Sequence, residues 1–209
     1  MSSERTGGVY TSAVRPGLRT RLAGSMARRA RAKRRRMYLD LIRPAESESV
    51  LDVGCGDQGL ATLNVPGKVT GADRDPRPDY LGHDFVRADA RELPFSDGQF
   101  DVVYSNSLLE HVPPSDRERV AAEMSRTGRR LFVQTPNRGF PLEPHALLPL
   151  VHWLPRPLGR RLWALGVTGE PFDDIRLLRA RELRRLFPDA QIVRERVGPF
   201  TKSLIAVRR

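Results

Sequence analysis

Residues 50–60, Val-Leu-Asp-Val-Gly-Cys-Gly-Asp-Gln-Gly-Leu, decide the fold of this chain. An apolar, β-branched run that ends in glycines is typical of a buried strand entering a tight turn. Glycines there permit positive φ angles and let a ligand approach the backbone amides closely. The spacing of Gly54, Gly56 and Gly59 also fits a dinucleotide fingerprint, so a nicotinamide-dependent oxidoreductase is one interpretation. Asp52 argues against it, because a carboxylate beside the turn repels a pyrophosphate and suits an ammonium group.

Four blocks of the sequence occur in an order that is informative: 50–56, 69–73, 86–95 and 100–112. Together they resemble the class I S-adenosylmethionine-dependent methyltransferases, and most closely the type 11-like branch that acts on small molecules. The resemblance spans roughly residues 48–137. It implies an α/β, Rossmann-like class I methyltransferase fold, with a seven-stranded, mostly parallel sheet and an antiparallel terminal hairpin. It also implies S-adenosylmethionine as the cofactor.

The resemblance assigns expected roles to the glycine turn. Gly54 and Gly56 would let the turn wrap the methionine part of the cofactor, and Asp52 would attract its ammonium group. The alternative for Asp52 is a carboxylate that only stabilises the turn. The chain departs from the family at Gln58, where a third glycine is usual, because its glycine comes one residue later.

The other cofactor contacts follow the later strands. Asp73 ends the second strand, where an acid can accept both ribose hydroxyls, a charged interaction worth ~1.5–3 kcal/mol. In the family, the position of Asp89 accepts from the adenine amino group, the Ala90 amide faces the ring, and Asn106 borders the sulfonium. The complete expected set of cofactor residues is Asp52, Gly54, Cys55, Gly56, Asp73, Arg74, Asp89, Ala90 and Asn106.

Two histidines are candidate catalytic residues. Methyl transfer is a displacement that depends mainly on orientation, but a hydroxyl acceptor benefits from a general base. His111 follows the fourth strand, and His145 begins a proline-rich segment with Glu143 nearby to orient it. No His, Cys, Asp or Glu spacing along the sequence predicts a metal site.

The net charge of +11 is concentrated at the N-terminus. Residues 1–37 hold eleven basic residues and one acid, whereas the rest of the chain has 25 basic and 24 acidic residues. The basic segment favours an RNA methyltransferase as the alternative function. The near-neutral body argues against nucleic acid as a partner, and no Asn-Pro-Pro-Tyr-like or catalytic-cysteine motif follows a strand.

The domain organisation is read from composition. Residues 1–24 are expected to be a flexible basic arm, and 25–209 the methyltransferase domain, beginning with a helix over 25–42 that Ser25 caps. Only a turn or two of helix fits between the first two strands, and a loop is expected over 73–85. Residues 138–176, rich in Pro, Leu and Trp, are expected to fold as short helices that form a lid-like substrate insertion over the mouth of the sheet.

The apolar residues of the 138–176 segment allow three readings: a lid core, a pocket for an apolar acceptor, or a patch that contacts a membrane surface. The single Cys55 and the absence of a 20-residue apolar run favour a cytoplasmic protein, peripheral to the membrane in the third reading. We therefore expect an enzyme that methylates a small or lipid-like acceptor on O, N or C. A non-catalytic cofactor-binding protein is the remaining alternative.

Overall fold

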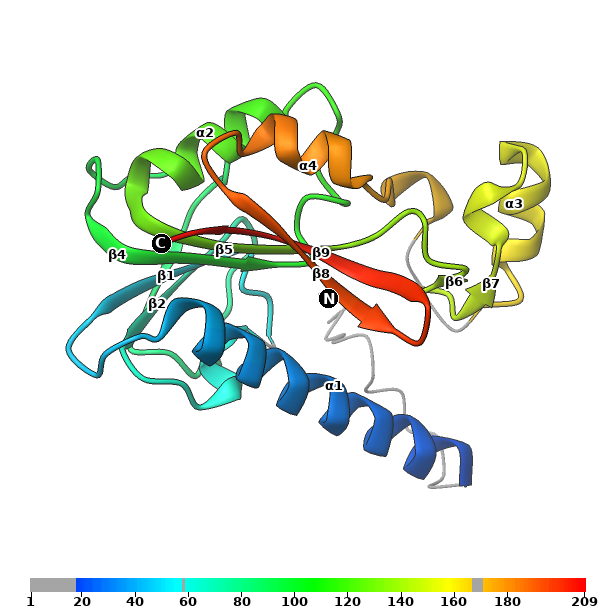
Figure 1. The fold of residues 1–209 in the computed structure, drawn as a ribbon, viewed down its shortest axis with the longest axis horizontal. Coiled ribbons are helices and arrows are strands. Elements are labelled where there is room, and N and C mark those ends of the chain that lie inside the picture. The colour runs from blue at the N-terminus through cyan, green and yellow to red at the C-terminus, as the bar shows by residue number, and fades with distance from the viewer. Residues whose placement is uncertain (1–17, 58, 167–170) are drawn as a thin grey trace, which may run out of the picture.

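The computed structural model describes residues 18–57, 59–166 and 171–209 (Figure 1). Its centre is a seven-stranded sheet with the order β3-β2-β1-β4-β5-β9-β8. The first five strands in this order are parallel, β9 is antiparallel to β5, and β8 is antiparallel to β9. The predicted sheet and its antiparallel terminal hairpin are therefore confirmed. The strands are β1 (Ser49–Val53), β2 (Lys68–Asp73), β3 (Asp84–Arg87), β4 (Phe100–Asn106), β5 (Gly128–Pro136), β8 (Gln191–Val197) and β9 (Phe200–Arg208).

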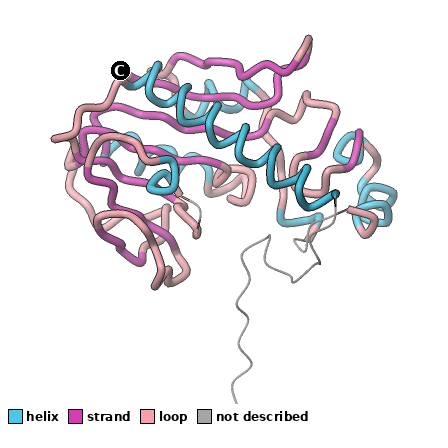
Figure 2. Tube along the Cα trace, turned by 90° about the horizontal axis from the view of Figure 1, so that it is seen from below, coloured by secondary structure: helices cyan, strands magenta, loops and turns pink. Residues whose placement is uncertain are grey.

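Helices cover both faces of the sheet, as Figure 1 shows. On one face, α2 (Arg117–Thr127) and α4 (Ala180–Leu186) pack against Leu51, Val103 and Leu131. On the opposite face, α1 (Leu18–Ile42) lies across the sheet (Figure 2). Strands buried on both faces explain the continuous apolar runs of β1, β4 and β5.

The end of α1 is held by aromatic residues. Tyr38 is fully buried, and its ring makes edge contacts with Tyr104 and Phe132 at centroid distances of 5.5 Å. The helix begins at Leu18, so the prediction that it starts at Ser25 is wrong, and residues 18–24 are helical rather than part of a loose arm. Alanine and arginine propagate a helix well, which extends it beyond the serine that was expected to cap it. The remainder of the predicted arm, 1–17, lies outside the described residues.

The connections near the site are short. Between β1 and β2 there is only a 3-10 turn, η1 (Leu60–Leu63), and residues 74–83 form loop and turns, as predicted. Asp116 is at the N-cap of α2, although its side chain makes no capping hydrogen bond.

The 138–176 segment lies beyond the end of β5 (Figure 1). It contains α3 (Arg156–Trp163), the 3-10 turns η2 (Val151–Trp153) and η3 (Phe172–Asp174), and a two-stranded ribbon of β6 (Leu142–Glu143) and β7 (Leu148–Pro149). Short helices were predicted; the ribbon was not.

Candidate functional site

A cavity of about 230 Å³ lies at the carboxyl ends of the parallel strands. Ligands of open α/β sheets bind at this edge, next to the point where the strand order reverses, here between β1 and β4. Sequence positions far apart converge on it. Of the eleven predicted site residues, six line it: Gly54, Asp73, Arg74, Asp89, Ala90 and His111.

The glycine turn forms one wall of the cavity. Gly54 and Gly56 have φ angles of 70° and 52°, in the left-handed region that glycine adopts without strain. A side chain at Gly54 would overlap Leu108, which also lines the cavity. The Gly54 amide donates to the Ala72 carbonyl at 2.8 Å, which fixes the turn against the end of β2.

Asp73 connects the end of β2 to the same turn. Its Oδ2 accepts a hydrogen bond from the Gly56 amide at 2.9 Å, and its Oδ1 accepts from the Asp75 amide at 3.0 Å. Arg77 also reaches Oδ1 at 3.4 Å and bridges to Asp57 at 3.1 Å. The carboxylate is thus held rigidly at the cavity wall, in the place that the sequence predicts for a ribose acceptor.

Asp52 lies behind the turn and does not line the cavity. It is 1% exposed, and its Oδ2 accepts from the Leu60 amide at 2.5 Å and lies 3.5 Å from the Tyr80 hydroxyl. Burial raises the pKa of its carboxyl to about 7. The two hydrogen bonds lower the pKa, but burial has the larger effect. A Cβ atom at Gly59 would overlap this carboxylate. These contacts match the alternative reading of Asp52, a carboxylate that stabilises the turn, and the overlap explains why residue 59 is a glycine.

Asp89 is held by its neighbour Arg91. The Arg91 guanidinium donates to both Asp89 oxygens, at 2.7 to 3.2 Å, and also to Asp116 at 3.0 Å. The side-chain hydrogen bonds from Arg91, together with its amide, hold the pKa of Asp89 at about 2. Asp89 is therefore an ionised acceptor at the cavity, but one shared with an arginine that the sequence analysis did not consider.

Besides Asp52, three further predicted cofactor residues and one predicted catalytic residue lie outside the cavity lining. Cys55 is 5% exposed, and burial raises the pKa of its thiol. Gly56 is connected to the cavity through Asp73, and Asn106 ends β4 with its Oδ1 buried and without a hydrogen-bond partner in the described part of the chain. The fourth is His145.

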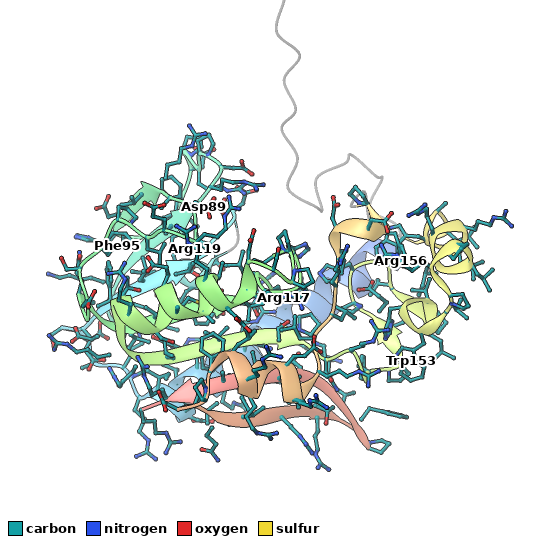
Figure 3. All side chains as sticks on the ribbon, turned by 90° about the horizontal axis from the view of Figure 1, so that it is seen from above. Asp89, Phe95, Arg117, Arg119, Trp153 and Arg156 are labelled. Atoms are coloured by element: carbon teal, nitrogen blue, oxygen red, sulfur yellow. The ribbon has the colours of Figure 1, made fainter. Side chains whose placement is uncertain are left out.

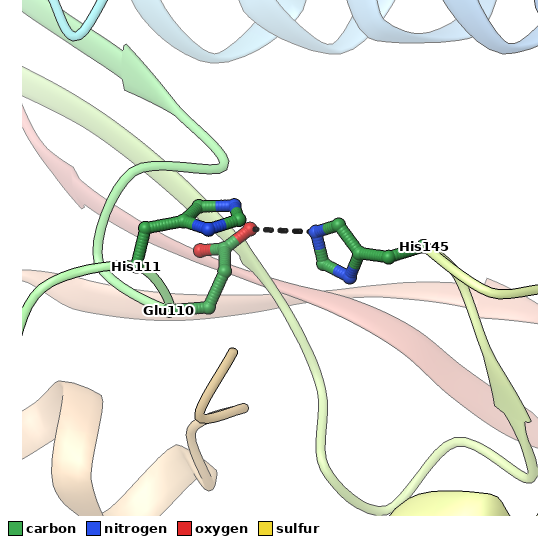
Figure 4. Close-up of side chains that lie close together, drawn as sticks. All are labelled: Glu110, His111 and His145. Carbon is green, nitrogen blue, oxygen red and sulfur yellow. Dashed lines mark ion pairs between the residues drawn. The ribbon is translucent and has the colours of Figure 1, made fainter. Parts of the chain in front are cut away.

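His145 and His111 are brought together by the fold (Figure 4). Their ring centroids are 5.2 Å apart and their planes nearly perpendicular. The predicted pairing of Glu143 with His145 is present, with Glu143 Oε1 2.7 Å from Nδ1. Glu110, which is completely buried, lies beside both rings, with Oε1 3.9 Å from His145 Nε2. The sequence analysis missed Glu110, because its part in the cluster depends on a contact across 35 residues.

A second cavity, of about 450 Å³, lies between the 138–176 segment and the body of the protein. Trp163 packs in the core of this segment with Ala146 and Val151, and its ring is 5.3 Å from that of Phe172. Figure 3 shows Trp153 and Arg156 on this segment, at the opposite side of the view from Asp89. The cavity walls carry arginines from both sides, namely Arg117, Arg138, Arg156, Arg176 and Arg179.

Comparison with known proteins agrees with this geometry. Residues 51–130 match a family model described as a methyltransferase domain. A ubiquinone biosynthesis O-methyltransferase from Bordetella parapertussis is 36% identical over 103 residues, which cover 43% of each chain. The chain spans about half the length of the curated relatives it matches.

Solved structures share the fold at low sequence identity. One is the 1,6-didemethyltoxoflavin-N1-methyltransferase of Burkholderia thailandensis with bound S-adenosylhomocysteine, at a TM-score of 0.58 and 18% identity, covering 91% of this chain and 85% of that one. Another is the magnesium protoporphyrin IX methyltransferase of Synechocystis PCC 6803, at a TM-score of 0.59 and 14% identity. The match covers 96% of this chain and 91% of that one.

The strand order and the glycine turn, together with these matches, identify the fold as that of the class I S-adenosylmethionine-dependent methyltransferases. Residues 51–130 match the methyltransferase domain family, and structural neighbours were solved with S-adenosylhomocysteine or S-adenosylmethionine bound. In the part of the chain that the structure describes, no helix is long and apolar enough to cross a membrane.

Proposed function

We propose that this protein transfers the methyl group of S-adenosylmethionine to a small or lipid-like acceptor. The observation that carries the proposal is the convergence of Gly54, Asp73 and Asp89 on one cavity at the switch in strand order. These residues offer a turn with positive φ for the methionine part, one carboxylate for the ribose, and a second for the adenine. The ubiquinone biosynthesis relative and the structural neighbours act on small molecules according to their names, which supports the same class of acceptor here.

In this proposal the methyl group points away from the strands, toward the second cavity. His111 lines the first cavity and Glu143, which contacts His145, lines the second, so the histidine pair lies between the two cavities. The enzyme holds the acceptor in line with the sulfonium and excludes water, an orientation effect that supplies ~7–11 kcal/mol of the barrier. The arginines of the second cavity suit an acceptor with an anionic or polar aromatic part.

The exposed apolar side chains of the 138–176 segment support a lipid-like acceptor over a small polar one. Leu147, Leu150, Trp153, Leu158, Leu162 and Leu165 are each at least 36% exposed. Arg160 and Arg161 lie among them on α3. Leucine and tryptophan beside arginine are suited to the surface of an anionic bilayer, which would make the protein cytoplasmic and peripheral to the membrane.

Calorimetric titration with S-adenosylmethionine, S-adenosylhomocysteine and NAD tests the proposal. Binding of the two sulfur ligands only is expected, at least tenfold weaker in Asp73→Ala, because the ribose loses its acceptor. Asp79→Ala is the matched control, since Asp79 is an exposed acid in the adjoining loop. Binding of NAD alone, or no binding of either sulfur ligand, would overturn the cofactor assignment. Transfer of radiolabelled methyl to a panel of phenols, quinols and lipids then identifies the acceptor.

An RNA methyltransferase is the second candidate, and the exposed cations of α1 favour it. Arg28, Arg29, Arg35 and Arg36 are exposed, although Arg35 donates to the Asn64 carbonyl and thus contacts the body of the protein. This candidate requires RNA affinity that falls steeply with salt and is lost when residues 1–24 are deleted. The proposed small-molecule activity requires that the same deletion leave S-adenosylmethionine affinity unchanged.

A further inference from the structure

We propose that Glu110, His111 and His145 bind one divalent transition-metal ion, with Zn²⁺ as the reference cation, beside the cofactor cavity (Figure 4). Two imidazole nitrogens and one carboxylate oxygen suit Zn²⁺ and its first-row neighbours better than Mg²⁺ or Ca²⁺. The binding stands on the geometry alone, whereas the role given to the ion below rests on the proposed methyl transfer.

The distances between ligand atoms fit a shared ion. One ligand atom from each of the three residues lies within 4.8 Å of the other two. Glu110 Oε1 and His145 Nε2 are 3.9 Å apart, which is too far for a hydrogen bond. Two ligands that each lie about 2.0–2.2 Å from one ion are separated by at most about 4.4 Å, so this pair can hold an ion as it stands. The third ligand needs only a small side-chain movement.

The buried charge of the cluster calls for a cation. Glu110 is fully buried and Glu143 is 1% exposed. In the part of the chain that the structure describes, neither carboxylate forms an ion pair with lysine or arginine, and Glu110 Oε1 has no hydrogen-bond partner. A buried carboxylate is costly unless it is paired, protonated or bound to a metal. One divalent ion would balance the two negative charges.

The surroundings of the cluster orient its ligands as they would around a metal. His145 Nδ1 lies 2.7 Å from Glu143 Oε1, and the other Glu143 oxygen accepts from the Ala146 amide at 2.6 Å. A proton on Nδ1 leaves the Nε2 lone pair directed toward Glu110, the arrangement of a carboxylate–histidine–metal triad. The Thr135 hydroxyl donates to Glu110 Oε2 at 2.9 Å, which leaves Oε1 for the ion.

The position of the cluster indicates a hydroxyl acceptor. Because His111 lines the cofactor cavity and Glu143 the second cavity, an ion here has its open positions between the two. A hydroxyl oxygen bound to the ion loses its proton to water more readily. That oxygen then forms a bond to the methyl carbon, while the electron pair of the carbon–sulfur bond passes to sulfur. The products are a methyl ether, S-adenosylhomocysteine and one proton.

Titration of untagged, full-length, chelator-treated protein with Zn²⁺ and Co²⁺ tests the site. One ion per chain is expected, with a visible Co²⁺ absorption spectrum. His145→Ala and Glu110→Gln should weaken binding at least tenfold and abolish the spectrum. Glu143→Gln should weaken binding about 10- to 100-fold, as loss of an outer partner does. His83→Ala is the control, because His83 is an exposed histidine outside the cluster.

Thermal unfolding and S-adenosylmethionine titration of the same variants, both in chelator, separate the possible failures. Variants that melt cooperatively and keep cofactor affinity but lose the ion support the proposal. Wild-type protein that binds the cofactor but no stoichiometric ion, or variants that bind the ion unchanged, would overturn it and leave a hydrogen-bonded Glu–His cluster. Ion binding without cofactor binding would instead overturn the proposed function. If Glu110→Gln does not fold, ion binding by His145→Gln tests the site instead.

Discussion

The Asp73 carboxylate accepts the Gly56 amide at 2.9 Å, so a single side chain joins the end of β2 to the turn that follows β1. The turn after β1 and the end of β2, which both border the proposed cofactor cavity, are thereby held at a fixed separation. The same carboxylate lines the cavity. Asp73 consequently has a structural and a binding task, and the two can be distinguished by substitution.

Asp73→Asn should separate these tasks. An asparagine oxygen can still accept from Gly56, so the free energy of unfolding should change by less than about 1 kcal/mol. The loss of the charged acceptor should weaken S-adenosylmethionine binding about tenfold, measured by calorimetry. Asp73→Ala should show both effects, with an additional loss of ~1–3 kcal/mol of stability from the unpaired amide. Equal affinities of the wild type and Asp73→Asn would contradict a charged ribose contact.

The raised pKa of Asp52 predicts a pH-dependent stability. With a folded-state pKa of about 7 and an unfolded value near 3.9, the folded state binds more protons between these values. The contribution of Asp52 is therefore greatest below about pH 4 and is lost as pH rises to 7. In the wild type, the free energy of unfolding should therefore fall by up to about 1.4 kcal/mol per pH unit in this range, and Asp52→Asn should remove this dependence. Denaturant unfolding from pH 4 to 8 measures it.

Asp79→Asn is the control for this experiment, because Asp79 is an exposed acid in the loop next to Tyr80. Its profile should run parallel to that of the wild type. If the Asp52→Asn profile were parallel as well, Asp52 would titrate normally in the folded protein.

The contact between Gly59 and Asp52 predicts a coupled pair of substitutions. Gly59 has a φ of −59°, so alanine there disturbs packing and not the backbone conformation. Gly59→Ala should cost about 1–3 kcal/mol, because its Cβ would overlap the Asp52 carboxylate and crowd the Cys55 carbonyl. In an Asp52→Ala background the cost should fall by at least about 0.5 kcal/mol, measured in a double-mutant cycle. If the stability costs of the two substitutions were additive, the Asp52 carboxylate would accommodate the alanine at position 59 without a loss of stability.

Tyr38 provides a stability test remote from the site. Tyr38→Ala should cost about 3–5 kcal/mol, because its ring fills the space between α1 and the sheet. Its hydroxyl is buried and has no hydrogen-bond partner in the described residues. Tyr38→Phe, which serves as the control, should therefore be neutral or stabilising by up to about 1 kcal/mol in thermal unfolding. A destabilised phenylalanine variant would reveal a partner for the hydroxyl, such as water.

The sequence predicted those parts of the molecule that depend on local pattern. The apolar run Val50–Val53 predicted the first strand, and the family resemblance of the acids and glycines that follow the strands predicted six of the residues that line the cavity. The start of α1 was misplaced because Gly24 and Ser25 were taken as a helix boundary, whereas the Leu, Arg and Ala residues on both sides have high helix propensity and the helix runs through them. The cluster of Glu110 with His145 was missed because it depends on how the 138–176 segment packs against the loop that follows β4.

The packing of Gly59 against Asp52 also constrains how this sequence can change over generations. A chain that acquires a side chain at position 59 must shorten or displace the one at position 52, and neither step is favourable alone. The two positions should therefore covary among homologous sequences.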